Sequence, residues 1–196
     1  MTKALVRVKR QIGAIAQRAG SGELPEYVRA DEVAKAIELT GRAPVKALLR
    51  CLWLTGARIS EVLALEVEGI DFRAKAVKLV TLKQKKKKIR VLPLPGEFLG
   101  ELAMLINSEK ITGRVFPWSR SRAFELVRDA LVKAGVEKKR AHPHALRHGH
   151  AVHALEHGAP LNIVQRTLGH SSVLTTSTYL KVTGEDVRRY YDGITW

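Results

Sequence analysis

The spacing of the apolar residues changes markedly between residues 76 and 95 of this chain, in the stretch AVKLVTLKQKKKKIRVLPLP. Apolar residues alternate with other residues on both sides of a lysine run, a pattern typical of two β-strands joined by a basic hairpin. Most of the remaining chain has apolar residues at helical spacing. The sequence therefore predicts an α+β domain that is mostly helical and contains a small antiparallel β-sheet or hairpin.

The helical segments are separated by glycine and proline residues that predict where each helix stops or starts. Asp31 is the predicted cap of the first long helix, and Cys51 is predicted to lie in the core because it falls within the apolar run ALLRCLWL. We expect a short helix that starts within the segment 57–72, and helices in these ranges: 31–41, 43–56, 96–110, 119–136, 144–158, 159–170, 175–180 and 184–194.

The charge of the chain favours a polyanionic partner. Lysine and arginine total 34 against 19 aspartate and glutamate residues, a formal net charge of +15. Nucleic acid is the usual partner of such a domain, and an anionic membrane surface is the weaker alternative. The chain has no apolar run of about 18–20 residues and no apolar segment typical of a signal peptide at its N-terminus. With a single cysteine, the sequence predicts a cytoplasmic protein that does not contact a membrane.

Six of the seven histidines lie between His142 and His157. Histidines four residues apart occur in zinc sites, but this stretch has neither an HExxH motif nor a nearby cysteine. We therefore expect no metal site. His144 and Arg147, three residues apart in the first turn of a helix, instead suit a phosphate group, because arginine and the helix N-terminus both attract anions.

Several motifs, taken in order along residues 30–185, resemble the catalytic domain of the tyrosine recombinase family, which includes phage integrases and Xer-type enzymes. The motifs are TGARISEVLAL, the basic hairpin before RVLPLP, and HPHALRHGHAVHALEHGAPLNIVQRTLGHSSVLTTSTYLKV. The resemblance implies the fold of that catalytic domain over residues 29–196. It also implies that residues 1–28 form a basic N-terminal arm or linker rather than the full core-binding domain that many members carry.

The resemblance implies a site that uses neither a metal nor another cofactor. Lys85 matches the hairpin lysine, although Lys83 and Lys86 stay open for that role. The implied catalytic residues are Arg58, Lys85, His144, Arg147, His170 and the nucleophile Tyr179. Glu61 and His148 would support them, and the implied DNA-contacting residues are Lys83, Lys86, Lys87, Lys88 and Arg90.

The function implied by the resemblance is site-specific recombination of double-stranded DNA through a 3′-phosphotyrosyl intermediate. The protein would assemble as a tetramer on DNA, with its C-terminal segment docked on a neighbouring subunit, in a prokaryotic cytosol or as part of a virus or mobile element. Three alternatives are a DNA-binding relative without catalysis, a topoisomerase-like or telomere-resolving enzyme, and a basic RNA-binding protein. The ordered presence of every catalytic residue type disfavours the first and third, whereas only the closeness of the motifs to those of integrases disfavours the second.

Overall fold

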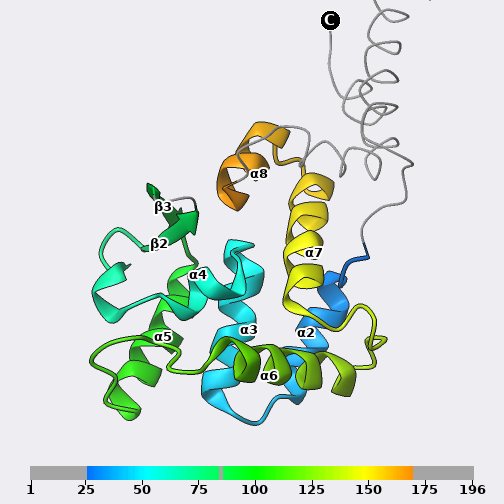
Figure 1. Ribbon diagram of the computed structural model, residues 1–196, viewed down its shortest axis with the longest axis horizontal. Coiled ribbons are helices and arrows are strands. Elements are labelled where there is room, and N and C mark those ends of the chain that lie inside the picture. The colour runs from blue at the N-terminus through cyan, green and yellow to red at the C-terminus, as the bar shows by residue number, and fades with distance from the viewer. Residues whose placement is uncertain (1–25, 84–85, 170–196) are drawn as a thin grey trace, which may run out of the picture. The chain divides into compact units, whose positions relative to one another are not determined.

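A computed structural model describes residues 26–83 and 86–169 of the chain (Figure 1). Residues Glu26–His153 form one compact unit, and Ala154–Gly169 are the described part of a second. The helices are α2 Ala30–Leu39, α3 Ala43–Thr55, α4 Ile59–Leu63, the 3₁₀-helix η1 Val67–Gly69, α5 Gly96–Ser108, α6 Arg120–Lys133, α7 Pro143–Glu156 and α8 Leu161–Leu168. The strands are β1 Ile70–Asp71, β2 Ala76–Lys83 and β3 Lys86–Pro93. The predicted fold class, mostly helical with a small antiparallel sheet, is confirmed.

The sheet has three strands in the order β1-β2-β3, and both pairings are antiparallel. Strands β2 and β3 are the predicted pair, and their register runs from Ala76 opposite Pro93 to Lys83 opposite Lys86. Strand β1 was not predicted, because two residues are too few to show an alternating pattern. It pairs Ile70 with Val77 and Asp71 with Ala76, and so extends the sheet by one short edge strand.

Helix α3 ends as the sequence predicts, at a glycine. Gly56 adopts a left-handed conformation with φ of 57°, which an L-residue with a side chain rarely accepts. The chain reverses there and enters α4 at once.

The predicted cap of the first helix is wrong by two residues. Helix α2 begins at Ala30, with Arg29 as its N-cap, and Asp31 lies within the first turn. The backbone N–H of Arg29 donates to a carboxylate oxygen of Glu32 at 2.9 Å. Glu32, three residues beyond the cap, thus supplies the acceptor that was expected from Asp31, which instead pairs with the Arg29 guanidinium at 3.2 Å.

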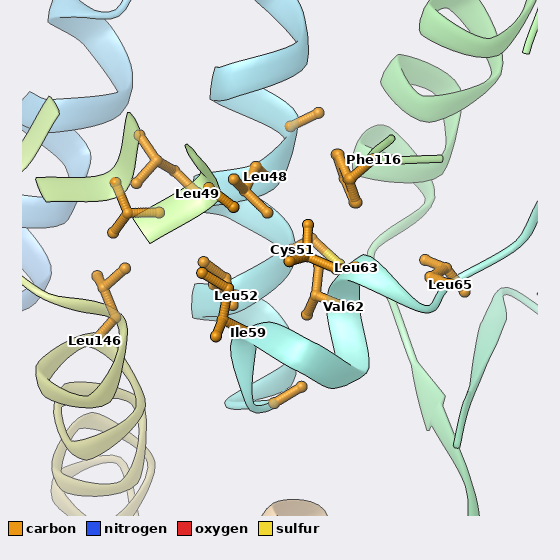
Figure 2. Close-up of a cluster of buried hydrophobic side chains, with 14 of the residues drawn as sticks. Leu48, Leu49, Cys51, Leu52, Ile59, Val62, Leu63, Leu65, Phe116 and Leu146 are labelled. Carbon is orange, nitrogen blue, oxygen red and sulfur yellow. The ribbon is translucent and has the colours of Figure 1, made fainter. Parts of the chain in front are cut away.

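Helix α3 supplies much of the core of the first unit, with its neighbours α2, α4, α5 and α6 packed around it. Cys51 is fully buried as predicted, and burial raises the pKa of its thiol to about 12. The core therefore fixes the position of the α3–α4 turn. Figure 2 shows part of this cluster, with the labelled residues Leu48, Leu49, Cys51, Leu52, Ile59, Val62, Leu63, Leu65, Phe116 and Leu146.

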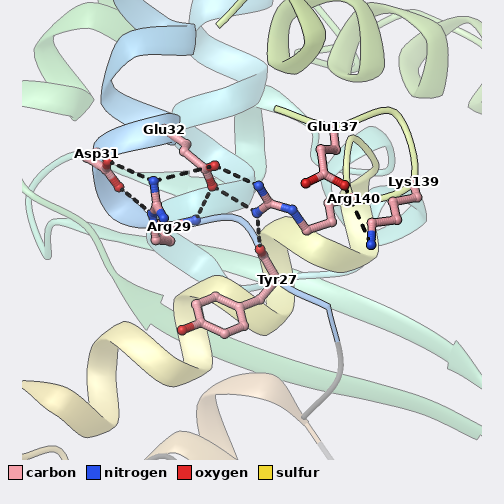
Figure 3. Close-up of polar contacts among 7 residues, drawn as sticks. All are labelled: Tyr27, Arg29, Asp31, Glu32, Glu137, Lys139 and Arg140. Carbon is pink, nitrogen blue, oxygen red and sulfur yellow. Dashed lines mark hydrogen bonds and ion pairs between the residues drawn. The ribbon is translucent and has the colours of Figure 1, made fainter. Parts of the chain in front are cut away.

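The segment Glu26–Arg29, which we call the entry segment, is fastened to the loop before α7. Arg140 donates to the backbone carbonyl of Tyr27 at 2.8 Å and makes two hydrogen bonds to Glu32, at 3.1 and 2.8 Å (Figure 3). The backbone N–H of Val28 also donates to the carbonyl of Ala145 in α7 at 3.2 Å. The start of the described chain is thus held against the helix that carries His144 and Arg147.

The described part of the second unit contains the end of α7 and all of α8. Helix α8 follows Pro160 and ends at Gly169, which has φ of 68°. The helices predicted at 175–180 and 184–194, like residues 1–25 of the predicted arm at 1–28, lie outside the described residues. Among the helices that are described, none is both long and apolar enough to span a bilayer.

Candidate active site

Arg58 lies at the turn between α3 and α4, where it is the N-cap residue of α4. Its backbone N–H donates to one carboxylate oxygen of Glu61 at 2.9 Å, and its Nη1 donates to the other at 3.1 Å. The Arg58 side chain keeps 31% of its surface exposed, whereas that of Glu61 keeps 3%. Glu61 therefore holds Arg58 from its buried side and leaves part of the guanidinium open to a ligand.

Glu61 also ties the sheet to this turn. Its carboxylate accepts a hydrogen bond from Thr81 Oγ1 of β2 at 2.6 Å and one from Arg90 Nη2 of β3 at 2.5 Å. Burial alone would raise the pKa of Glu61, but the hydrogen bonds from Thr81 and the Arg58 backbone and the charges of Arg90 and Arg58 outweigh it, so the pKa is lowered. The carboxylate is thus ionised at neutral pH.

Helix α7 brings the second half of the site. The residue before it, His142, accepts a hydrogen bond from the Ala145 backbone N–H at its Nδ1, at 3.1 Å, and so caps the first turn. His144 follows in that turn and stays accessible to solvent. Arg147 is buried and donates from Nη1 to the backbone carbonyl of Gly56 at 2.8 Å, which joins α7 to the turn that carries Arg58.

Four basic side chains meet at a cavity of about 50 Å³. They are Arg58, Arg120, His144 and Arg147, and the rest of the wall comes from Ile59, Ser60 and Pro143. A cavity of this volume has room for roughly one to two water-sized groups. Its size and its positive lining suit the non-bridging oxygens of a phosphate group.

Arg120 is the one basic member of this cavity that does not belong to the implied catalytic residues. It is the first residue of α6, whose N-cap Ser119 accepts a hydrogen bond from the Arg122 backbone N–H at 3.2 Å. The serine before a helical pattern was a readable signal for a helix start. Nothing in that signal places this helix start beside His144, because the two segments meet only in the folded chain.

The two histidines near Arg147 have lowered pKa values. Partial burial, and then the charge of Arg147, lower the pKa of His144. Burial, followed by the neighbouring His144 and Arg147, lowers the pKa of His148 to about 4. Both rings are therefore neutral near pH 7, and a neutral imidazole can accept a proton as well as donate a hydrogen bond.

The structure brings together three of the six implied catalytic residues, namely Arg58, His144 and Arg147. Glu61 lies behind Arg58, and His148 lies one helical turn after His144. Lys85, His170 and Tyr179 lie outside the described residues. The backbones of Lys83, Lys86, Lys87 and Lys88 belong to the two strands of the predicted hairpin.

A DNA contact requires an exposed side chain, and that of Arg90 is buried. Its side chain keeps 6% of its surface exposed and pairs with Glu61. The lysine run just before it suggested an exposed arginine, but residues on the two faces of a strand have opposite surroundings. We therefore interpret Arg90 as a structural partner of Glu61 and do not retain it as a DNA contact.

Within residues 26–83 and 86–169, no group of three or more histidine, cysteine, aspartate or glutamate side chains is arranged to hold a metal ion. Three histidines of this stretch have other contacts: His142 caps α7, His144 lines the basic cavity and His150 contacts the end of α3.

Residues 26–185 match the phage integrase family. The chain belongs to that family. It is 34% identical over 170 residues to a tyrosine recombinase of Pseudothermotoga lettingae, which covers 83% of this chain and 58% of that protein. It is 30% identical over 188 residues to the tyrosine recombinase XerD of Staphylococcus saprophyticus, which covers 87% of this chain and 62% of the relative. This family member thus spans about three fifths of the length of these curated relatives.

Solved structures of the family share the fold. The crystal structure of XerA recombinase matches with a TM-score of 0.72 and 25% identity, over 89% of this chain and 66% of XerA. The catalytic domain of bacteriophage HP1 integrase matches with a TM-score of 0.66 and 23% identity, over 87% of this chain and 95% of that domain. XerH bound to its difH substrate matches with a TM-score of 0.69 and 20% identity, over 86% of this chain and 54% of XerH.

Proposed function

We propose that this chain is the catalytic part of a site-specific DNA recombinase, which cleaves and rejoins DNA strands through Tyr179. The observation that carries the proposal is the basic cavity, in which Arg58, His144 and Arg147 meet from two separate segments. This arrangement occurs in a chain whose match to the phage integrase family extends from residue 26 to residue 185 and so includes Tyr179.

The cavity supplies the charge that phosphodiester cleavage needs. Negative charge grows on the non-bridging oxygens as the phosphorus becomes five-coordinate, and fixed cationic donors stabilise that state more than the ground state. Arg58 and Arg147 are held in place by Glu61 and the Gly56 carbonyl. Their guanidinium groups would therefore bind the scissile phosphate without first having to be ordered.

In the proposed step, the Tyr179 hydroxyl oxygen attacks phosphorus and the bond from phosphorus to the 5′-oxygen breaks. A tyrosine hydroxyl has a pKa of about 10, so it needs a base, and neutral His144 would take the proton. Lys85 would give a proton to the leaving 5′-oxygen, and His170 would add a donor to the phosphate. The 3′-phosphotyrosyl product keeps the energy of the phosphodiester, so rejoining would need no ATP. The arginines would supply the positive charge at the phosphate, so the step would need no metal.

The basic hairpin and the ends of the chain have proposed roles in assembly. Lys83, Lys86, Lys87 and Lys88 would contact the DNA backbone beside the cleaved bond. Residues 1–28 would act as a basic arm before the catalytic domain of residues 29–196. The segment after Tyr179 would dock on a neighbouring subunit, and the working form would be a tetramer on a double-stranded recombination site.

Covalent capture tests the proposal. A pool of duplexes with randomised half-sites and a nick near the centre traps a cleaved strand, because the short piece beyond the cut diffuses away. Wild type is expected to give a protein–DNA adduct that survives denaturation, with or without a chelator. Tyr179→Phe should give none, whereas Tyr27→Phe, a change of a tyrosine in the entry segment outside the basic cavity, should behave as wild type. If wild type forms no adduct with any duplex, or if Tyr179→Phe still forms one, the proposal is wrong.

A further inference from the structure

The carbonyl end of α3 lies immediately before Arg58, and two side chains of α7 bind it. The last carbonyl groups of a helix have no partner within the helix and accept hydrogen bonds from elsewhere. Here the Trp53 carbonyl is 2.7 Å from His150 Nδ1, and the Gly56 carbonyl accepts from Arg147 Nη1 at 2.8 Å. Arg147 and His150 are three residues apart, so they project from the same side of α7.

We propose that His150 is a positioning residue for Arg58, and that it works together with Arg147 by holding the end of α3 at a fixed distance from α7. This inference rests on the proposed function, since it concerns the placement of Arg58 against the scissile phosphate. The sequence analysis assigned no chemistry to His150.

Hydrogen bonds inside the α3–α4 turn connect the end of α3 to Arg58. Thr55 Oγ1 donates to the Cys51 carbonyl at 2.6 Å and accepts from the Ala57 backbone N–H at 3.2 Å. The residue between them, Gly56, is the one whose carbonyl Arg147 holds. Trp53, Thr55, Gly56 and Ala57 are therefore each tied either to α7 or within the turn, and Arg58 is the next residue along the chain.

The partner of His150 also fixes the state of its ring. A backbone carbonyl only accepts hydrogen bonds, so the hydrogen at Nδ1 belongs to the histidine and a neutral ring is the Nδ1–H tautomer. Burial lowers the pKa of His150, and the charges of Arg147 and His153 lower it further, against the opposing effect of the bond to Trp53. The ring is thus a neutral donor to the end of α3.

The same ring packs on Trp53 edge-on, with the ring centroids 6.5 Å apart and an angle of 89° between the planes. Packing and hydrogen bonding can be separated by substitution. His150→Phe keeps an aromatic ring beside Trp53 and removes the donor. His150→Asn removes the ring and keeps an N–H group close to the position of Nδ1.

The rate of adduct formation in a single turnover, measured on a duplex selected as above, tests the inference together with DNA affinity and melting temperature. His150→Phe should slow the reaction by roughly tenfold or more, because a displaced Arg58 no longer fits the phosphate, while the Kd for DNA changes by less than about threefold. His150→Asn should recover most of the rate. If His150→Phe reacts as fast as wild type, or if His150→Asn is as slow as His150→Phe, His150 does not position Arg58.

A spectroscopic readout covers the case in which His150→Phe fails to fold. In ¹⁵N-histidine spectra of the wild-type chain without DNA, the signal that disappears in His150→Asn should show a neutral ring protonated at Nδ1. A ring protonated only at Nε2 would overturn the inference. A wild type that forms no adduct counts against the proposed function, whereas an active wild type with the wrong tautomer or an indifferent His150→Phe counts against this inference alone.

Discussion

At the scale of single residues, Glu61 is the acceptor that links the parts of the site to one another. Three side chains from three elements converge on its carboxylate, namely Arg58, Thr81 and Arg90. Removing one partner of a buried ion pair leaves the other charge uncompensated, and this typically costs about 3–5 kcal/mol. The pair between Arg122 and Glu125 has the same three-residue spacing as the pair between Arg58 and Glu61, but both of its side chains are about half exposed.

Substitutions of Glu61 and Glu125 give a matched comparison of a buried and an exposed carboxylate. Glu61→Gln is expected to lower the free energy of unfolding at pH 7 by about 3 kcal/mol, because Arg90 loses its buried counter-charge. Glu125→Gln should lower it by less than about 1 kcal/mol, since exposed pairs are screened by water. Urea unfolding of both variants checks this. Equal losses in the two variants would contradict the assignment of Glu61 as the buried centre of the network.

The pH dependence of the same comparison follows from the lowered pKa of Glu61. A carboxyl group whose pKa is lowered by folding contributes fully above its ordinary value of 4.5 and loses that contribution as pH falls through the folded value. The difference in the free energy of unfolding between wild type and Glu61→Gln should therefore be constant from neutral pH down to near pH 4.5. It should shrink as the pH falls further. A difference that grows as the pH falls would contradict the direction of the shift.

Arg120 is the basic residue of the cavity that the implied catalytic set does not include. Arg120→Ala should slow adduct formation by roughly tenfold or more, because one donor to the charged phosphate is lost, and should reduce the slope of log affinity against log salt by about 1. Arg128→Ala, on the same helix but paired with Asp129, is the control and should leave the rate unchanged. Equal rates for Arg120→Ala and wild type would exclude Arg120 from the reaction.

At the scale of elements, Gly149 is a point of close contact between α7 and the entry segment. A Cβ built on Gly149 would lie 2.0 Å from the Val28 carbonyl oxygen and 3.0 Å from the Trp53 ring. Backbone cannot make room as a flexible side chain can, so a larger residue must push the entry segment away from α7. Gly100 in α5, by contrast, has nothing within 4 Å of such a Cβ.

Alanine at these two positions should have opposite effects. Gly149→Ala should destabilise the chain by about 2–3 kcal/mol, because a packed core does not accept the added atom. Gly100→Ala should stabilise it by about 0.5–1 kcal/mol, the usual gain from replacing glycine inside a helix. Thermal melting of both variants measures the two changes. A Gly149→Ala variant as stable as wild type would show that the entry segment does not lie against α7.

Sequence patterns predicted the elements and part of the site, but not the contacts between elements. The spacing of His144 and Arg147 indicated a phosphate-binding helix, and their order with Arg58 indicated the family. The partners of Arg90 and His150 could not be predicted, because Glu61 and Trp53 lie 29 and 97 residues away in sequence. The close packing of Gly149 against Val28 could not be predicted for the same reason, because these two residues meet only in the folded chain.

At the scale of the whole molecule, the formal charge of +15 favours contacts to many DNA phosphates, and the number of those contacts sets the response of affinity to salt. A protein that neutralises several phosphates releases their counterions, so its affinity falls steeply with salt. We expect the affinity for duplex DNA to drop by a factor of about 10³ or more between 50 and 200 mM salt. Fluorescence anisotropy across this range measures the drop. An affinity that hardly changes with salt would contradict a phosphate-based interface.

The most direct test of the central claim is the chemical identity of the protein–DNA link. Trypsin cuts after Arg166 and Lys181, so Tyr179 falls in one peptide, whereas Tyr190 and Tyr191 follow Arg189 in another. Tandem mass spectrometry of the trapped adduct should find the nucleotide on Tyr179, joined through a 3′-phosphate. A nucleotide on any other residue, or a link through a 5′-phosphate, would contradict the proposed chemistry.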